Sequence, residues 1–281
     1  NCNKKPPILS VFRRFSAPVI WESDLSIDDH LFLLLNDNDY FTKWDSGQLL
    51  MREIIKGRIE NKVKYKLEDS FNNAIKKSIK DFERKDPSFL ATLISLPGLS
   101  EIESLFEKVN PISIYRECIN FQVSIGINLL EDFSALLRRL LVFNVTQFWP
   151  NGKGERKLLG KIWFYLALAG DLQVKRNCVD SITSSSMTIA RAALGALKPL
   201  DSSETEEASN LFYNLWKDNP IVLDSWFAYE ASRPSKHGID FIEQLLSHTK
   251  FDWKAPNAIR AVLGGFSQNI ELFHSLDGQG Y

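Results

Sequence analysis

Apolar residues recur at helical spacing along most of the chain. The helix predicted to begin at Pro220 has apolar residues over more than half of its circumference: Val222, Leu223, Trp226, Phe227 and Tyr229. A helix with so wide an apolar surface needs neighbours on two sides. Stacked helical pairs provide them, because each layer lies between the one before and the one after. The pattern therefore predicts a fold of stacked helices.

Helix start signals occur at short intervals after residue 24. Each combines an N-cap side chain with acidic residues in the first turn or with Pro at the first helical position. They lie at Ser26–Asp29, Asp86–Pro87, Ser100–Glu103, Asn110–Pro111, Ser203–Glu206 and Asn219–Pro220. With the polar breaks between them, they predict about a dozen helices. No repeat of fixed period is visible, so the stack is expected to be an irregular superhelix.

The first part of the chain has a different pattern. Ile8–Trp21 is rich in β-branched and aromatic residues, and Pro18 within it marks an edge or a bend. We predict one or two strands here. Because the alternation typical of sheets is missing after Trp21, the expected fold is mainly α: stacked antiparallel helices preceded by a short β segment.

Composition and charge exclude several classes of function. The chain has 281 residues, of which 44% are apolar and 25% charged, as is usual for a soluble globular protein. A net charge of −1 does not favour a nucleic-acid or membrane-surface partner. No apolar run approaches the roughly 20 residues that span a bilayer. Three widely spaced cysteines, Cys2, Cys118 and Cys178, favour reduced thiols, so we expect a cytoplasmic protein.

Segments at both ends of the chain carry a resemblance to a known family. Asp224–Ala231, Pro256–Arg260 and Asp277–Tyr281 resemble the C-terminal helical domain of aminopeptidase N, a family of zinc-dependent aminopeptidases. Pro7–Val19 and Trp44–Gln48 are similar to the region where the small β domain of that family joins its helical domain. The two matches occur in the order of the family.

The resemblance implies a domain organisation and a role. Residues 1–23 would be the terminal strand segment of a preceding β-sandwich-like domain, and residues 24–281 the C-terminal helical domain, truncated at its C-terminal end. Between about residues 56 and 215 only the helical pattern is recognisable. In the family, such a domain covers the active-site cavity and gates the access of peptides. The implied partners are the catalytic and β domains of the same parent chain and a peptide substrate.

The chain lacks the residues for the chemistry of this family. A zinc aminopeptidase of this kind needs His-Glu-x-x-His on one helix. The four histidines are His30, His237, His248 and His274, and none begins such a motif. We therefore assign no catalytic residue, metal ligand or cofactor to this chain. Zinc would belong to the parent enzyme, and the chain alone is expected to be inactive.

Other catalytic motifs are absent as well. Gly154–Ile162 imitates a phosphate-binding P-loop but has one residue too many between its glycines, and Ile162 replaces the required Ser or Thr. There is no Gly-x-Ser-x-Gly motif and no Cys-x-x-Cys motif. The alternative to the peptidase domain is a free-standing helical-repeat scaffold that binds a protein partner.

One candidate binding site lies in the helix predicted from Pro256. Its apolar stripe is expected to comprise Ile259, Val262, Leu263 and Phe266. Asn257 in the first turn lies where free N–H groups favour an anion, and Arg260, at the border of the stripe, offers a bidentate grip on a carboxylate. Because the domain faces the substrate cavity in the resembled enzymes, we expect Asn257 and Arg260 to contact the distal end or C-terminal carboxylate of a peptide. In the alternative, Asn257 only helps the helix to begin and Arg260 makes a salt bridge.

Overall fold

The computed structural model describes residues 7–19, 23–142, 152–234 and 238–281. This part of the chain contains fifteen α-helices, one short 3-10 helix and no strand. The mainly α fold is therefore confirmed. Contacts divide the chain into two compact units, unit 1 (Asn1–Val109) and unit 2 (Asn110–Tyr281).

Unit 1 is organised around its longest helix, α2. Its elements are η1 (Arg13–Phe15), α1 (Ile27–Asn36), α2 (Tyr40–Ile59), α3 (Tyr65–Phe82), α4 (Pro87–Leu93) and α5 (Leu99–Glu103). All the other elements of the unit pack against α2. The core of the unit contains Leu34, Leu50, Met51, Ile55 and Leu90, none of which is accessible to solvent.

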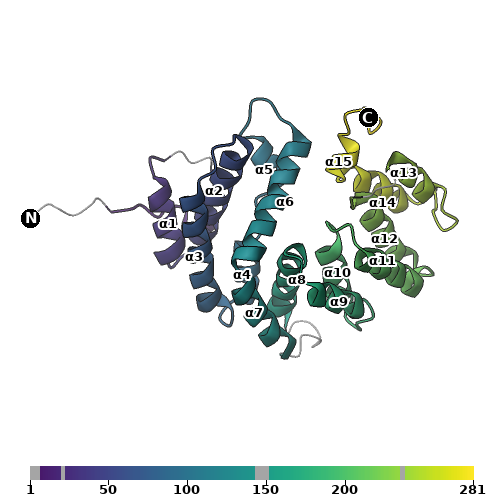
Figure 1. The fold of residues 1–281 in the computed structure, drawn as a ribbon, viewed down its shortest axis with the longest axis horizontal. Helices are drawn as coiled ribbons and strands as arrows, with labels where there is room; N and C mark the ends of the chain where they lie inside the picture. Colours follow the sequence, from purple (N-terminus) through teal and green to yellow (C-terminus); the bar gives the residue numbers. More distant parts are fainter. Residues whose placement is uncertain (1–6, 20–22, 143–151, 235–237) are drawn as a thin grey trace, which may run out of the picture. The chain divides into compact units, whose positions relative to one another are not determined.

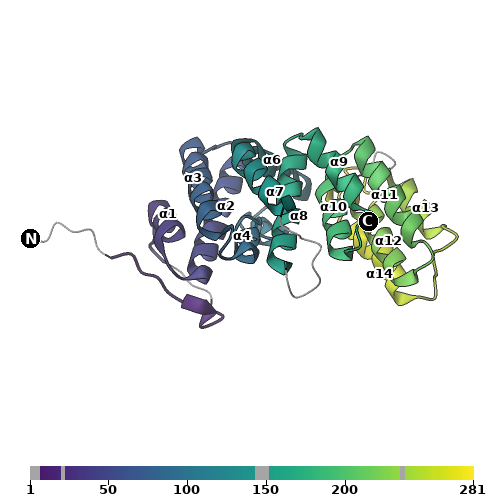
Figure 2. The same ribbon diagram turned by 90° about the horizontal axis from the view of Figure 1, so that it is seen from below.

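The described residues of unit 2 form ten helices. They are α6 (Pro111–Asn128), α7 (Leu130–Val142), α8 (Lys153–Leu168), α9 (Leu172–Ser181), α10 (Met187–Leu197), α11 (Ser203–Trp216), α12 (Pro220–Ser232), α13 (Gly238–Leu246), α14 (Pro256–Ser267) and α15 (Ile270–Phe273). Alternate helices pack on one another: α8 lies against α6 and α10, and α12 lies against α14 (Figures 1 and 2). The intervening helices α7, α9, α11 and α13 pack on these, so each inner helix is covered from more than one side.

Two of these helix pairs approach so closely that only glycine fits. A Cβ atom on Gly126 of α6 would lie 2.4 Å from the carbonyl oxygen of Tyr165 in α8. On Gly265 of α14 it would lie 2.8 Å from the carbonyl oxygen of Ala228 in α12. Since real Cβ atoms do not approach backbone oxygens so closely, a side chain here would push the helices apart.

Most of the predicted helix starts are confirmed. Asp86, Asn110 and Asn219 cap α4, α6 and α12, each before a proline, and Ser26 forms a capping box with Asp29 at α1. Ser100 is different, because it lies inside α5, whose N-cap is Gly98.

The helix start predicted at Ser203–Glu206, which has the spacing of a capping box, is also wrong. Ser202 caps α11 by accepting a hydrogen bond from the backbone of Thr205. Glu206, the expected second member of that box, is bound instead by the guanidinium of Arg233 at 2.8 and 3.0 Å. Ser202 alone thus makes the local cap, and Glu206 takes part in an ion pair with a distant arginine.

The strands predicted over Ile8–Trp21 do not form in residues 8–19, while residues 20–22 lie outside the described part of the chain. Phe12, Arg14 and Phe15 have positive φ angles, and the backbone turns through η1 instead of extending. A strand needs a partner strand to be stable, and the described residues offer none. The boundary at residues 23/24 between a β domain and a helical domain stays a prediction.

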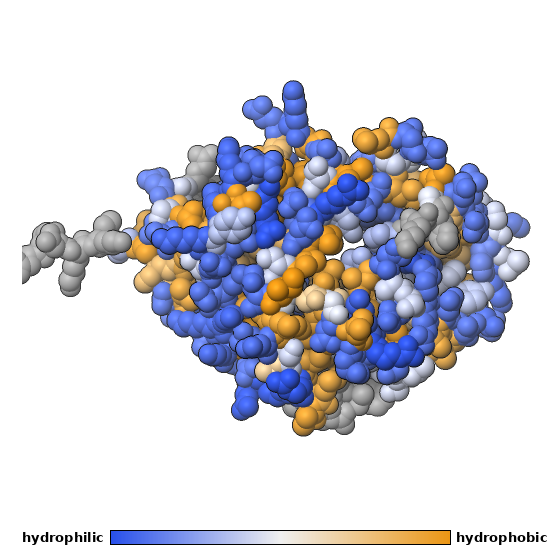
Figure 3. Space-filling model, in the orientation of Figure 1, coloured by the Kyte–Doolittle hydropathy of each residue, from blue (hydrophilic) through white to orange (hydrophobic). Residues whose placement is uncertain are grey.

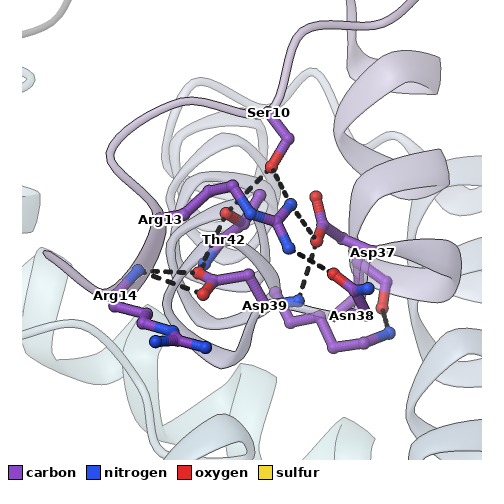
Figure 4. A network of polar contacts seen from close by, with 9 residues as sticks. Ser10, Arg13, Arg14, Asp37, Asn38, Asp39 and Thr42 are labelled. Carbon is purple, nitrogen blue, oxygen red and sulfur yellow. Dashed lines mark hydrogen bonds and ion pairs between the residues drawn. The ribbon is translucent and has the colours of Figure 1, made fainter. Parts of the chain in front are cut away.

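Polar contacts hold this N-terminal segment on the turn between α1 and α2 (Figure 4). The Arg13 guanidinium donates to Asp37 at 3.0 Å and to the side-chain oxygen of Asn38. The backbone N–H of Arg14 donates to Asp39 at 3.0 Å, and Asp39 also caps α2. The segment that resembles the end of a β domain is therefore attached to the first helices of the chain.

A buried ion-pair network joins three helices of unit 2. Glu230 in α12 is 3% exposed, and it accepts hydrogen bonds from Ser209 and, at 2.9 Å, from Arg233. Arg233 also binds Glu206 of α11, and its carbonyl oxygen accepts a 2.8 Å hydrogen bond from Asn269, the N-cap of α15. The network thus connects α11, α12 and α15.

We predict that Arg233→Met destabilises the chain by about 3–5 kcal/mol, because the carboxylate of Glu230 is then left buried without its partner. Arg176→Met is the matched control, since Arg176 donates two hydrogen bonds to the carboxylate of Glu207 at an exposed site. Urea unfolding of both variants measures the difference. Equal losses of stability in the two variants would contradict the prediction.

Candidate functional site

The structure places Asn257 and Arg260 on the exposed side of α14. The buried side of the helix consists of Ala258, Val262 and Gly265. The predicted stripe is therefore only partly correct: Val262 is buried, Ile259 and Phe266 are half-buried, and Leu263 is 46% exposed. Because the backbone of α12 reaches Gly265, the small residues face the neighbouring helix. Arg260 consequently lies in solvent and not at a screened border.

The first turn of α14 is open to an anion. Its N-cap is Ala255, which cannot cap with a side chain, and no acidic residue occupies the first turn. The amide groups of this turn and the helix dipole therefore attract negative charge, while the Asp252 carboxylate before the helix accepts from the backbone N–H of Lys254. Asn257 does not cap the helix, and Arg260 forms no ion pair with any described residue. In the alternative, Asn257 helps the helix to begin and Arg260 makes a salt bridge. Neither a cap by Asn257 nor a salt bridge of Arg260 is thus present in the described part of the chain.

The loop that precedes α14 is held by His248. Its Nε2 lies 3.2 Å from the Tyr213 hydroxyl, and its Nδ1 accepts a 3.1 Å hydrogen bond from the backbone N–H of Lys250. An Nδ1 that accepts is unprotonated, so His248 is neutral in this arrangement. Burial, and then the charge of Lys250, lower the pKa of His248 below its usual value.

A cleft that the sequence did not predict lies elsewhere in unit 2. It has a volume of about 540 Å³ and is lined by Tyr115, Arg116, Ile119 and Asn120 of α6, by Pro199, Asp201 and Pro234, and by Asn269, Glu271 and Leu272 around α15. Arg116 and Glu271 form an ion pair across it at 2.6 Å. They are 155 positions apart in the chain, so no local pattern could have identified the pair.

The cleft has a largely polar lining. Arg116 is 65% exposed in its side chain and Glu271 34%, so their ion pair contributes little to stability. Burial raises the pKa of Tyr115, and the nearby Glu271 raises it further, so its phenol stays neutral and can donate a hydrogen bond. A guanidinium, a carboxylate and a phenol suit the recognition of a polar chain such as a peptide.

The described residues contain no group of three or more His, Cys, Asp or Glu side chains that could hold a metal ion. Cys118 and Cys178 are buried free thiols, and burial raises the pKa of Cys178 to about 12, which makes it unreactive. Cys2 and His237 lie outside the described part of the chain. Gly154–Ile162, the imitation of a P-loop, is part of helix α8 and forms no phosphate-binding loop.

Several large hydrophobic side chains of unit 2 reach the surface, among them Ile127, Val142, Leu172 and Trp253. On the face in Figure 3, hydrophobic residues (orange) lie interspersed with hydrophilic ones (blue). Such exposed apolar residues are normal for a folded protein. No helix in the described ranges has the length and hydrophobicity needed to cross a membrane.

Comparison with known proteins identifies the family. Residues 27–281 match the family described as "Domain of unknown function (DUF3458_C) ARM repeats", and the chain belongs to it. The stacked helices of unit 2 agree with the helical-repeat architecture of that description.

Particular relatives are named aminopeptidase N. The chain is 27% identical to the protein of Caulobacter vibrioides over 99% of its own length, and 26% identical to those of Haemophilus influenzae and Escherichia coli over 98%. In each case it covers 32% of the relative. Among solved structures, it is similar to Legionella pneumophila aminopeptidase A in complex with aspartic acid, with a TM-score of 0.82, 26% identity, and coverage of 96% of this chain and 33% of that one.

The predicted resemblance to the helical part of aminopeptidase N is therefore confirmed. The matches extend through residues 56–215, where the sequence had shown only a helical pattern. The chain spans about a third of the length of the relatives that it matches.

We predict that acidification weakens the loop before α14. Because the pKa of His248 is lowered in the folded state, the unfolded chain binds a proton more readily, and the stability due to neutral His248 is lost as the pH falls through about 6.5. The urea concentration at the midpoint of unfolding should fall more between pH 7.5 and pH 5 for the native chain than for the His248→Asn variant. In that variant the side-chain oxygen of Asn still accepts a hydrogen bond from the backbone N–H of Lys250. Burial also lowers the pKa of His30 in unit 1. Both proteins contain His30, so its contribution to the pH dependence of stability cancels when they are compared. The same pH dependence in both would refute the prediction.

Proposed function

We propose that this chain is the helical part of an aminopeptidase whose catalytic part belongs to the same protein. The observation that supports this is the match of nearly the whole chain to about a third of proteins named aminopeptidase N. The catalytic and β domains of the parent would be its partners, and peptides its substrates. Its proposed location is the cytoplasm.

In this proposal the chain gates a reaction that it does not perform. Zinc-assisted hydrolysis would remove the N-terminal residues of peptides, but the residues of this chain do not fit a zinc site. The sequence contains no His-Glu-x-x-His, and the described histidines lie apart, in α1, in the loop before α14 and after α15. The helices of the chain would instead cover the active-site cavity and select the peptides that enter.

Asn257 and Arg260 are proposed to bind the peptide. Arg260 is exposed and has no carboxylate partner among the described residues, so its guanidinium is available for a bidentate contact. The uncapped first turn of α14 adds backbone donors beside Asn257. Both features suit the C-terminal carboxylate or the distal end of a peptide.

The domain assignment is tested on the parent protein. We expect the parent to contain His-Glu-x-x-His, to bind zinc stoichiometrically and to release the chromophore from an alanyl anilide. The 281-residue chain alone should neither bind zinc stoichiometrically nor release the chromophore. A parent without that motif and without activity would favour the alternative, a helical-repeat scaffold that binds a protein partner.

The site is tested separately with Arg260→Ala in the parent. We expect the KM for peptides to rise about tenfold, which corresponds to the loss of one charge-assisted hydrogen bond, while the KM for a single-residue anilide changes little because it has no carboxylate. Arg84→Ala, at a side chain that is 82% exposed in unit 1, is the matched control. Equal effects on peptide and anilide would reject the contact.

A further inference from the structure

The cleft between α6 and α15 already holds a basic side chain of the protein itself. These two helices of unit 2 contact each other. Arg116 of α6 reaches across the cleft, and its Nε donates a 2.6 Å hydrogen bond to Oε1 of Glu271 in α15. The side chain of Arg116 is 65% exposed, so little packing holds it in this place. Because exposed ion pairs contribute little to stability, another cation can replace Arg116 at Glu271.

Glu271 itself belongs to a helix that is held in position from the other side. The N-cap of α15, Asn269, is 4% exposed and donates a 2.8 Å hydrogen bond to the carbonyl oxygen of Arg233. This bond attaches α15 to the buried network of Glu230 and Arg233. The Oε2 atom of Glu271 makes no hydrogen bond or ion pair with the described residues. The cleft therefore contains a positioned carboxylate with one oxygen available.

The other polar groups of the lining also favour a cation. Asp201 adds a second carboxylate, so two carboxylates stand against one guanidinium. The side-chain nitrogen of Asn120 donates to Glu117, and its side-chain oxygen makes no hydrogen bond with the described residues. Tyr115 adds a phenol ring, and the face of such a ring attracts positive charge. Acceptors of hydrogen bonds thus predominate in the cleft.

Apolar residues between these polar groups suit the methylene stem of a long basic side chain. Ile119 of α6, Leu272 of α15, Pro199 and Pro234 are half-buried and line the cleft. Lysine and arginine pack their stems along such surfaces while their heads stay in polar surroundings. The volume of about 540 Å³ lies within the roughly 300–1,000 Å³ of ligand pockets, so one basic side chain and its adjoining peptide groups fit.

We propose that this cleft binds the arginine or lysine side chain of a polypeptide. Glu271 accepts hydrogen bonds from the cationic head in place of Arg116, and the apolar residues contact the stem. Arg116 therefore competes with the ligand for Glu271. The inference does not depend on the aminopeptidase assignment, because it rests on groups of unit 2 alone.

Calorimetric titration of the 281-residue chain tests the proposal. N-acetylarginine amide should bind saturably, and N-acetylcitrulline amide, which has nearly the same shape without the charge, should bind at least about tenfold more weakly. Glu271→Gln should weaken the binding of the arginine compound by at least about tenfold, because the negative charge is lost. Glu60→Gln in unit 1 is the matched control and should leave it unchanged. Glu60 is 34% exposed, as Glu271 is, and also forms an ion pair, with Lys62.

The expected effect of Arg116→Gln has the opposite sign. Removal of the competing guanidinium should tighten the binding of N-acetylarginine amide by up to about fivefold, the upper limit for an exposed ion pair. A ligand that used its own carboxylate would instead bind to Arg116, and the same substitution would weaken its binding.

Titration with butylguanidine distinguishes the sources of the cation. This compound has the guanidinium and the stem but no peptide groups, so tighter binding of N-acetylarginine amide indicates the side chain of a polypeptide, as proposed. Tighter binding of butylguanidine would assign the cleft to a free small cation and overturn the proposal. The proposal would equally be overturned by no saturable binding, equal binding of the arginine and citrulline compounds, insensitivity to Glu271→Gln, or weaker binding after Arg116→Gln.

Discussion

The carboxylate of Glu230, buried in α12, lies at the centre of the polar network that joins α11, α12 and α15 of unit 2. Burial raises its pKa, and the charges of Arg233 and the hydroxyl of Ser209 act in the opposite direction. A buried charge is tolerated only when its partners are fixed in good geometry. Arg233 meets that requirement and also binds Glu206 and, through its carbonyl oxygen, Asn269. The need to satisfy one carboxylate thus fixes α11 and α15 relative to α12.

Around this network, glycines determine which helices come together. Gly126 lets α6 approach α8, and Gly265 lets α14 approach α12. Between α10 and α12 no such contact is made, although Gly195 offers the space. Small residues thus have two effects. They let helix backbones pack closely where the helices meet, and they leave a cavity where the helices do not meet.

The candidate binding residue Arg260 differs from the arginines that join segments of the chain. Arg260 has no partner among the described residues, whereas Arg233, Arg13 and Arg58 are held in ion pairs. The paired arginines connect separate segments, and the guanidinium of Arg260 stays available for a ligand.

The sequence by itself determined the helical class, most helix starts and the family resemblance, because N-caps, prolines and apolar spacing act over a few residues. It also located Asn257 and Arg260 in the first turns of α14. Only the tertiary structure decided that α14 buries Ala258, Val262 and Gly265, that Glu206 binds Arg233 instead of capping α11, and that residues 8–19 form no strand. It alone brought Arg116 to Glu271 and formed the cleft around them. These features depend on which helices meet in space, and contacts between residues far apart in the chain leave no local pattern in the sequence.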